Sequence, residues 1–529
     1  MAATKKNSTA GMPPDSGTLG QLVQTSQQVS ANRGRLAKRE LLASLFLALS
    51  DAEFPLAVYY LTGALAQGRI GLGYATLKSV LPVPPAAEGR LNLAQVDRQM
   101  RRFAAIKGAG STVLRQDLLR ELLQAATVEE QNFLTRLFCG ELRQGALQGT
   151  VLEAVAEATQ VPDALLRRAL MLHGELAEVA QLARDGGTAA LAAIAPTTFR
   201  PLQPMLADTA VSAHAAVQRH GTTLLEFKLD GARVQMHKRG AQIRVYSRRL
   251  NDVTSAVPEI VSLGERLGVE EAILDGETLA LRGDGKPQPF QTTMRRFGRR
   301  LNVETMRSSL PLSVFFFDCM YLDGEDLTGL PTLERISRLR GFVQPTHLLP
   351  QLVTGDGIEA RAFLARALAA GHEGILAKST TAPYAAGSRG SDWLKVKPVH
   401  TLDLVVLAAE WGHGRRRGWL SNLHLGARDS ASGEFVMLGK TFKGLTDEML
   451  RWQTEVLQQL TVREEGNTVF VKPALVVEIA CNDIQTSPQY PAGMTLRFAR
   501  VKQYRSDKKP HEADTLETVR ALHAQATQS

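Results

Sequence analysis

The sequence of 529 residues has little cysteine and no long apolar segment. Its three cysteines, Cys139, Cys319 and Cys481, lie far apart and form no CxxC pair. This argues against a zinc finger or a disulfide-stabilised secreted domain and fits a reducing compartment. No run of about 18 apolar residues occurs, so we expect no membrane-spanning helix. The N-terminus lacks the apolar core of a signal peptide, and the expected location is the cytoplasm.

Acidic residues are outnumbered by basic ones, with 53 aspartates and glutamates against 62 lysines and arginines, a formal net charge of +9. Such an excess suits a polyanionic partner such as nucleic acid, although it also fits a role in solubility alone. Apolar residues make up 44% of the chain, enough for several buried cores. The length is typical of two to four domains.

Composition and periodicity divide the chain into four segments. Residues 1–34, rich in Ser, Thr, Gly and Gln, are predicted to form a disordered tail. Leucines spaced by three and four positions predict an all-helical domain over residues 35–198. Short, partly alternating runs separated by helices predict a mixed α+β domain over residues 199–399. Strand-like runs with glycine-rich turns predict a small β-barrel of OB-fold size over residues 400–529.

The stretch "EFKLDGAR" (226–233) places a lysine among mixed charges. On a strand, Glu226 and Lys228 would share one face, opposite Phe227, and Gly231 would leave room for a ligand. A lysine amine becomes a nucleophile only where burial or nearby cations favour its neutral form. Taken alone, the stretch is more simply explained as an edge strand with a solvated charge pair.

Further charged motifs follow in the same domain. They are "SRRL" (247–250), "ILDGE" (273–277), "EGILAK" (373–378) and "WLKVKP" (393–398). Each has an ordinary explanation, because Asp-Gly pairs form turns and alternating lysines often lie on a solvent-facing strand. Their occurrence together and in this order is hard to explain by chance.

With these motifs, the chain resembles the ATP-dependent DNA ligases, members of the covalent nucleotidyltransferase superfamily, over about residues 35–520. It is most similar to bacterial ligases of the LigB type, which share the three-domain plan of eukaryotic replicative ligases. "KLDGAR" (228–233) resembles the nucleotide-attachment motif of the family, and "LRFARVKQYRSDKKPHEADT" (496–515) resembles its C-terminal signature. NAD-dependent ligases carry a zinc module that three scattered cysteines cannot supply.

The resemblance implies a role for each motif residue. Lys228 would be the catalytic residue, whose Nζ attacks the α-phosphate of ATP to give lysyl-AMP and pyrophosphate. The AMP would pass to the 5′-phosphate of a nick and be displaced by the 3′-hydroxyl. Glu277 and Glu373 would hold the metal, Mg²⁺ with Mn²⁺ as an alternative. The residues that would bind the nucleotide are Glu226, Arg233, Arg248, Glu277, Phe317, Arg389, Lys395, Lys397, Arg497, Arg505, Asp507 and Lys508.

Within this set, the resemblance places Glu226 and Phe317 at the adenine and Lys397 at the α-phosphate. The four residues of the C-terminal signature would orient the leaving pyrophosphate. That role requires the C-terminal domain to close over the site for the first step and to swing away for sealing.

The implied partner is nicked double-stranded DNA, held by the helical domain without sequence preference. Candidate contact clusters are "GELRQGA" (140–146), "RRFGRR" (295–300) and "GHGRRRGW" (412–419). We expect a cytoplasmic, nucleoid-associated monomer without membrane contact, acting in DNA replication, repair or recombination. Two alternatives stay open: an RNA ligase or mRNA-capping type of nucleotidyltransferase, which shares the lysine motif, and an inactive DNA-binding scaffold.

Overall fold

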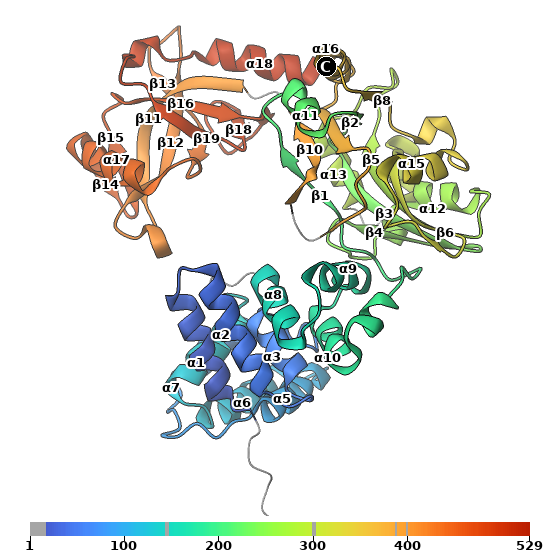
Figure 1. Cartoon of the computed structure of the whole chain (residues 1–529). Coiled ribbons are helices and arrows are strands. Elements are labelled where there is room, and N and C mark those ends of the chain that lie inside the picture. Colours follow the sequence, from blue (N-terminus) through green and yellow to red (C-terminus); the bar gives the residue numbers. More distant parts are fainter. Residues whose placement is uncertain (1–16, 143–147, 299–302, 387–388, 398–399, 529) are drawn as a thin grey trace, which may run out of the picture.

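The computed structural model describes residues 17–142, 148–298, 303–386, 389–397 and 400–528. Figure 1 shows a helical N-terminal domain at the bottom, a mixed central domain at the upper right and a strand-rich C-terminal domain at the upper left. This order confirms the multi-domain expectation. Within the described ranges, the structure contains no helix with the length and apolar character of a membrane span.

The N-terminal domain consists of helices that share one apolar core. They are α1 (Leu19–Ala31), α2 (Arg35–Ala48), α3 (Phe54–Leu61), α4 (Tyr74–Val80), α5 (Leu93–Ala105), α6 (Ser111–Gln124), α7 (Val128–Phe138), α8 (Gln148–Thr159), α9 (Asp163–His173) and α10 (Leu176–Ala192). The prediction of a disordered tail up to residue 34 is wrong at α1. Its Leu19, Leu22 and Val29 are buried in this core, and the Thr18 hydroxyl caps its N-terminus. Residues 1–16 lie outside the described residues.

Two five-stranded sheets make up the central domain. The first has the strand order β1-β10-β9-β2-β8 and the second β4-β3-β5-β6-β7. The strands are β1 (Leu206–Thr209), β2 (Thr223–Lys228), β3 (Ala232–Arg239), β4 (Gln242–Ser247), β5 (Glu271–Ala280), β6 (Leu312–Leu322), β7 (Glu325–Asp326), β8 (Gln351–Thr354), β9 (Gly374–Ser379) and β10 (Arg389–Val396). The helices are α11 (Ala213–His220), η1 (Thr254–Ala256), α12 (Pro258–Glu265), α13 (Phe290–Phe297), α14 (Val303–Ser309), α15 (Thr332–Arg340), η2 (Pro345–His347) and α16 (Gly357–Ala369).

The two sheets meet at the lysine motif. Strand β2 of the first sheet ends at Lys228, and β3 of the second sheet begins at Ala232. Apolar side chains from both sheets, among them Phe317 on β6 and Trp393 on β10, form one cluster. The short segment 229–231 therefore carries the chain from one sheet to the other, beside their shared core.

A seven-stranded sheet and a two-stranded ribbon form the C-terminal domain. The larger sheet runs β13-β12-β11-β15-β14, with β16 paired to β11 and β19, while β17 pairs with β18. The elements are β11 (His400–Trp411), η3 (Gly414–Arg416), β12 (Leu420–Arg428), β13 (Phe435–Thr441), α17 (Asp447–Gln459), β14 (Thr461–Glu465), β15 (Thr468–Val471), β16 (Val476–Cys481), β17 (Asp483–Thr486), β18 (Met494–Arg497), β19 (Arg500–Tyr504), η4 (Pro510–Glu512) and α18 (Leu516–Gln528). Among the described residues, the strand pairing does not close into a ring. The coarser expectation of a strand-rich domain is thus confirmed.

Candidate active site

Lys228 ends β2 with its side chain 22% exposed, at the edge of the central domain's shared core. Its Nζ lies 2.6 Å from Oε2 of Glu373 and 3.4 Å from the carbonyl oxygen of Leu229. The predicted alternation along β2 is confirmed, because Leu225 packs into an apolar cluster while Glu226 and Lys228 pair with charged partners. The strand therefore presents an amine to charged partners on one face while its other face stabilises the fold.

Glu373 lies between two ammonium groups. Its Oε2 faces Lys228 and its Oε1 accepts a hydrogen bond from Nζ of Lys397. Burial alone would raise the pKa of Glu373, but attraction to Lys228 and Lys397 leaves that pKa below its ordinary value. Burial and the Lys228 charge lower the pKa of Lys397. One carboxylate thus serves two ammonium groups, which holds Lys228 and Lys397 close together.

Gly374 makes this arrangement possible. Its φ of +146° is unfavourable for other residues, and a Cβ there would lie 2.2 Å from the carbonyl oxygen of Val396. Gly374 pairs with Lys228 across the β2–β9 ladder, and the Glu373 N–H donates to the Lys228 carbonyl over 3.0 Å. The missing side chain therefore lets the Glu373 segment pack between Lys228 and the end of β10.

Glu277 on β5 supplies a second carboxylate near the lysine. Burial raises the pKa of Glu277 to about 7, against the opposing attraction of Lys228 and Arg233. A Cβ on Gly231 would lie 2.3 Å from the Thr278 carbonyl oxygen and 3.1 Å from Cγ of Glu277. The expectation that Gly231 leaves room for a ligand is therefore wrong, because the backbone of β5 fills that space.

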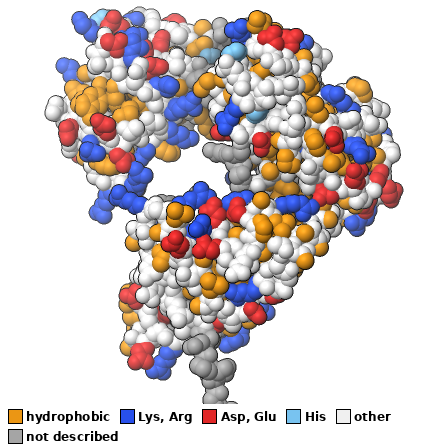
Figure 2. Space-filling model, in the orientation of Figure 1, with side chains coloured by type: hydrophobic (Ala, Val, Ile, Leu, Met, Phe, Trp, Pro, Cys, Tyr) orange, Lys and Arg blue, Asp and Glu red, His pale blue; other side chains and the backbone are white. Residues whose placement is uncertain are grey.

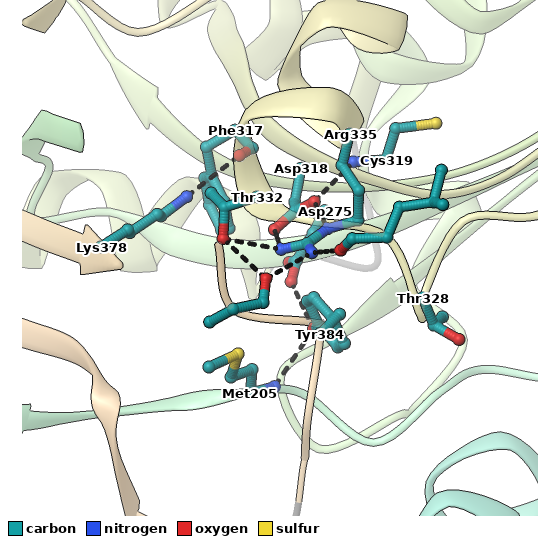
Figure 3. Close-up of polar contacts among 12 residues, drawn as sticks. Met205, Asp275, Phe317, Asp318, Cys319, Thr328, Thr332, Arg335, Lys378 and Tyr384 are labelled. Atoms are coloured by element: carbon teal, nitrogen blue, oxygen red, sulfur yellow. Dashed lines mark hydrogen bonds and ion pairs between the residues drawn. The ribbon is translucent and has the colours of Figure 1, made fainter. Parts of the chain in front are cut away.

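Glu226 and Phe317 both contact the buried ammonium group of Lys378 on β9. Lys378 Nζ is 2.7 Å from Oε2 of Glu226, and it donates to the Phe317 carbonyl oxygen over 3.0 Å (Figure 3). The same nitrogen lies 4.8 Å from the centre of the Phe317 ring and 4.4 Å from that of Trp393. Burial raises the pKa of Glu226 despite the attraction of Lys378. The two residues assigned to adenine are thus neighbours in the structure.

A second buried ion pair fixes the strand that carries Phe317. Arg335 on α15 binds both oxygens of Asp318, with Nε–Oδ1 at 2.8 Å and Nη2–Oδ2 at 3.1 Å (Figure 3). Both side chains are fully buried, and Arg335 also donates to the carbonyl oxygens of Leu330 and Ala382. This pairing holds β6 against α15, and with it the position of Phe317.

Arg233 on β3 is held by protein groups. Its Nε and Nη2 bind the two oxygens of Asp275 at 3.0 and 2.6 Å, and Nη1 donates to the Met205 carbonyl oxygen over 2.6 Å. The Tyr384 hydroxyl donates to Asp275 over 2.8 Å. Burial alone would lower the pKa of Arg233, but Asp275 raises it above its ordinary value. Its Cζ lies 5.6 Å from the centre of the Phe317 ring, so Arg233 borders the same cluster.

The C-terminal domain contributes Arg497 from β18. Its Nη1 and Nη2 bind Asp230 of the lysine motif at 2.6 and 3.1 Å. Its Cζ also lies 4.9 Å from the centre of the Phe290 ring and 5.4 Å from that of Phe498. In this arrangement, a residue of the C-terminal signature therefore contacts the lysine motif directly.

The rest of that signature lies in a separate cluster. Arg505 and Lys508 pair with Asp403 on β11, and Arg505 also pairs with Asp507. No ion pair within the described part of the chain joins these residues to Lys228 or Glu373. The structure thus brings only Arg497 of the signature to the lysine.

The remaining predicted residues have mixed positions. Lys395 lies near the end of β10, two residues before Lys397, and donates from Nζ to the carbonyl oxygen of Ala207 on the neighbouring strand β1 over 3.2 Å. Arg248 is exposed in the turn after β4. Arg389 begins β10, but its side chain lies outside the described residues.

Several residues that pair with the predicted site residues were not identified from the sequence, and one buried arginine was assigned to a DNA-contact cluster. Asp275 in "ILDGE" was assigned no role, yet it lies in β5 and pairs with Arg233. The motif "EGILAK" drew attention to Lys378, whereas no sequence pattern pointed to Tyr384. In "RRFGRR", Arg296 is fully buried and binds Glu259 at 2.8 Å, so it is no DNA contact. Residues 143–146 of "GELRQGA" and residues 299–300 of "RRFGRR" lie outside the described residues.

The structure thus brings together a lysine amine, two carboxylates and a second lysine, which are groups that the resemblance to the covalent nucleotidyltransferases predicts. Three family models match the chain: "DNA ligase N terminus" over residues 75–156, "ATP dependent DNA ligase domain" over 204–397 and "ATP dependent DNA ligase C terminal region" over 416–508. The middle match covers every element of the lysine site except Arg497.

Similar proteins agree. A "Probable DNA ligase" of Anaeromyxobacter sp. (strain Fw109-5) is 54% identical over 96% of this chain and 98% of its own length. "DNA ligase B" of Mycobacterium tuberculosis (strain CDC 1551 / Oshkosh) is 50% identical over 94% and 98%. The solved structure "Pmar-Lig_PreS3" shares the fold with a TM-score of 0.63, at 18% identity over 92% of this chain and 99% of that one. The chain therefore belongs to the ATP-dependent DNA ligase family and is an enzyme, which favours this function over the RNA ligase, capping and scaffold alternatives.

Proposed function

We propose that the protein seals 5′-phosphate/3′-hydroxyl nicks in duplex DNA through a lysyl-AMP intermediate on Lys228. The observation that carries the proposal is the position of the Lys228 amine, 2.6 Å from Glu373 in a site that also contains Lys397 and Glu277. Nζ would form a bond to the α-phosphorus of ATP while the bond to pyrophosphate breaks. Because Lys397 shares Glu373 with Lys228, it is placed to neutralise the phosphate oxygens during the displacement.

The adenine is assigned to the neighbourhood of Glu226 and Phe317. This assignment is supported by their shared partner, Lys378, which contacts Glu226 on β2 of one sheet and Phe317 on β6 of the other. Arg233 would border the ribose. The residues assigned to the phosphates are Arg248, Arg389, Lys395 and Lys397.

Glu277 and Glu373 would hold Mg²⁺, or Mn²⁺ in its place. The fit is supported by two oxygen donors that both act on Lys228, one of which, Glu277, is buried with a pKa raised to about 7. No group of three or more metal-ligating side chains occurs among the residues that the structure describes. That set suits Mg²⁺, which commonly takes one or two carboxylates and completes its coordination with substrate phosphates and water. A bound metal would supply charge for the triphosphate oxygens and would neutralise the carboxylates that now hold the lysine amine.

The C-terminal domain is proposed to act as an OB-fold that changes position between steps. Its signature residues Arg505, Asp507 and Lys508 lie in their own cluster, away from the pairs of the lysine site, whereas Arg497 reaches Asp230. Orienting pyrophosphate with the first three residues therefore requires a different domain arrangement from this one. We assign the present arrangement to a state in which they are not in use.

Nicked DNA is the proposed substrate, bound by a monomer without sequence preference in the nucleoid. Figure 2 shows lysine and arginine side chains along the opening between the three domains, mixed with acidic side chains on the helical domain. Arg415 on the β11–β12 loop is 81% exposed and available for a phosphate, although it also pairs with Asp447. Contacts of this kind bind the backbone and read no bases.

The test is covalent labelling of the full chain with α-labelled ATP and, in parallel, labelled NAD. We expect label from ATP with Mg²⁺, none from NAD, and none with Lys228→Ala, which should still bind nicked DNA. The exposed Lys472 serves as the matched control, so Lys472→Ala should label normally. Transfer to nicked DNA but not nicked RNA is expected. Absence of label on the wild-type chain, or full label on Lys228→Ala, would contradict the proposal.

A further inference from the structure

Asp403 lies near the start of β11, six residues after Lys397 of the lysine site. Its Oδ2 accepts from Nη1 of Arg505 at 2.9 Å and from Nζ of Lys508 at 2.5 Å. The Asp403 side chain is 10% exposed, so its charge has few water partners. One shielded carboxylate therefore holds two cations of the C-terminal signature, Arg505 and Lys508.

The position of Asp403 is set by the fold. Its backbone N–H donates to Oδ2 of Asp514 over 2.7 Å, and its carbonyl oxygen accepts from the Asp514 N–H at 2.8 Å. Asp403 also pairs in register with Glu478 of β16. The carboxylate would therefore remain in place if Arg505 and Lys508 moved away.

The two edges of the Arg505 guanidinium have different partners. Asp507 binds Nε at 2.9 Å and Nη2 at 2.6 Å, which fixes the plane of the guanidinium. Asp403 takes the remaining nitrogen, Nη1. Glu478 also attracts Arg505, but its carboxylate accepts from Gln503 at 2.8 Å. Asp507 thus orients Arg505. Asp403 occupies Nη1 of Arg505 and the ammonium group of Lys508, which are the groups that a phosphate would need.

We propose that Asp403 is a positioning residue that competes with the triphosphate of ATP for Arg505 and Lys508. The proposal rests on the proposed function, in which these cations orient the leaving pyrophosphate. ATP must replace a fixed carboxylate at both cations before the first step. After that step, Arg505 and Lys508 pair with Asp403 again. This releases pyrophosphate and favours the domain arrangement used for sealing. The hydrogen bond from Lys508 to Asp403 raises the pKa of Lys508, in keeping with a strong attraction.

The test compares full-length Asp403→Asn with Asp429→Asn, a matched control in an exposed turn of the same domain that binds Ser432 locally. Lysyl-AMP formation is measured against ATP concentration, and pyrophosphate inhibition and sealing of a pre-adenylylated nick are measured separately. For Asp403→Asn we expect a KM for ATP lowered about threefold to tenfold and pyrophosphate inhibition strengthened to a similar degree. Sealing of the pre-adenylylated nick should not become faster, and Asp429→Asn should behave as wild type.

A double variant tests whether the effect passes through the proposed cations. In a Lys508→Met background, Asp403→Asn should change the KM for ATP less than it does in the wild-type background. An equal change, or an unchanged KM for Asp403→Asn in the wild type, overturns the proposal. If Asp403→Asn does not fold, Asp403→Ser is measured instead, and failure of both variants to fold shows a purely structural residue and also overturns it. Wild-type labelling by ATP in the same experiment upholds the proposed function independently of these outcomes.

Discussion

Replacing Lys378 by methionine is expected to destabilise the central domain and to disturb the proposed adenine site. The Lys378 ammonium is fully buried and compensates the charge of Glu226, which is 1% exposed and lies 2.7 Å away. Methionine fills a similar volume but leaves that carboxylate with Gln351 as its remaining partner, at 2.6 Å. The variant thus removes one half of a buried ion pair and little packing.

The expected size follows from that geometry. Removing one partner of a buried ion pair costs about 3–5 kcal/mol, because the other charge stays buried without compensation. Glu226 limits the cost by taking up a proton, since burial already raises its pKa. A carboxyl group with a raised folded-state pKa stabilises the fold below its ordinary pKa and loses that contribution as the pH rises. The deficit of Lys378→Met should therefore be smaller at pH 5 than at pH 8.

Hydrogen exchange followed by mass spectrometry is the suitable assay, because three domains need not unfold in one transition. Amides of β2 and β9 report on the affected sheet, and those of β12 and β13 serve as an internal reference. Adding Glu226→Gln to Lys378→Met removes the uncompensated charge and should recover most of the lost protection, to within about 1–2 kcal/mol of the wild type.

The reasoning is refuted by either of two results. Lys378→Met could lower the stability of β2 and β9 by less than about 1 kcal/mol, the range of an exposed ion pair. Alternatively, the double variant could be as unstable as the single one, which would place the cost in packing and not in the charge of Glu226.

Three further predictions concern other parts of the molecule. Asp507→Ala should slow self-adenylylation more than sealing of pre-adenylylated DNA, and equal losses in separate assays of the two steps would remove its proposed role. Arg497→Ala breaks the ion pair to Asp230, so small-angle scattering should show a larger radius of gyration for the free protein, and an unchanged value would mean that other contacts hold the domains. Burial lowers the pKa of His237 to about 3, so the unfolded chain gains a proton first as the pH falls below 6.5. His237 alone should therefore lower stability by about 1.4 kcal/mol per pH unit between about pH 6.5 and 3. Because burial also lowers the pKa of His372 to about 4, denaturation of His237→Gln at pH 7 and 5 should show a slope that is reduced by this amount and not abolished.

Local patterns predicted the elements well. The apolar run "LSVFFFDCMYL" forms β6 (Leu312–Leu322), and a turn at Arg239 and Gly240 joins β3 to β4. Alternation and glycine placement are properties of adjacent residues, so a short window contains them. Helix α1 was not predicted because it has few apolar residues in a segment rich in glutamine and serine. These apolar residues are buried only because the surrounding helices pack against them.

The candidate site was predictable where motif and strand geometry determine it. Lys228, Glu373 and Lys397 come together because β2, β9 and β10 are neighbours in one sheet. The locations of Arg505 and Lys508 depend on the position of the whole C-terminal domain. They also depend on whether these two residues bind Asp403 or a ligand, which no local sequence pattern can predict. Arg296 lies in a basic sequence cluster that suggested a surface contact, but its side chain is buried. A basic residue can be buried in this way when it pairs with a carboxylate such as that of Glu259.

The alternation along β2 also constrains how such a chain can change in length. Leu225 and Phe227 pack into the core while Glu226 and Lys228 form ion pairs on the opposite face. Inserting or deleting a single residue within this strand would turn all four side chains over together, so that the Lys228 amine would enter the apolar layer and the two apolar side chains would leave it. Gains and losses of residues during evolution should therefore gather in outlying hairpins such as that near Gly285, while the spacing within β2 stays fixed.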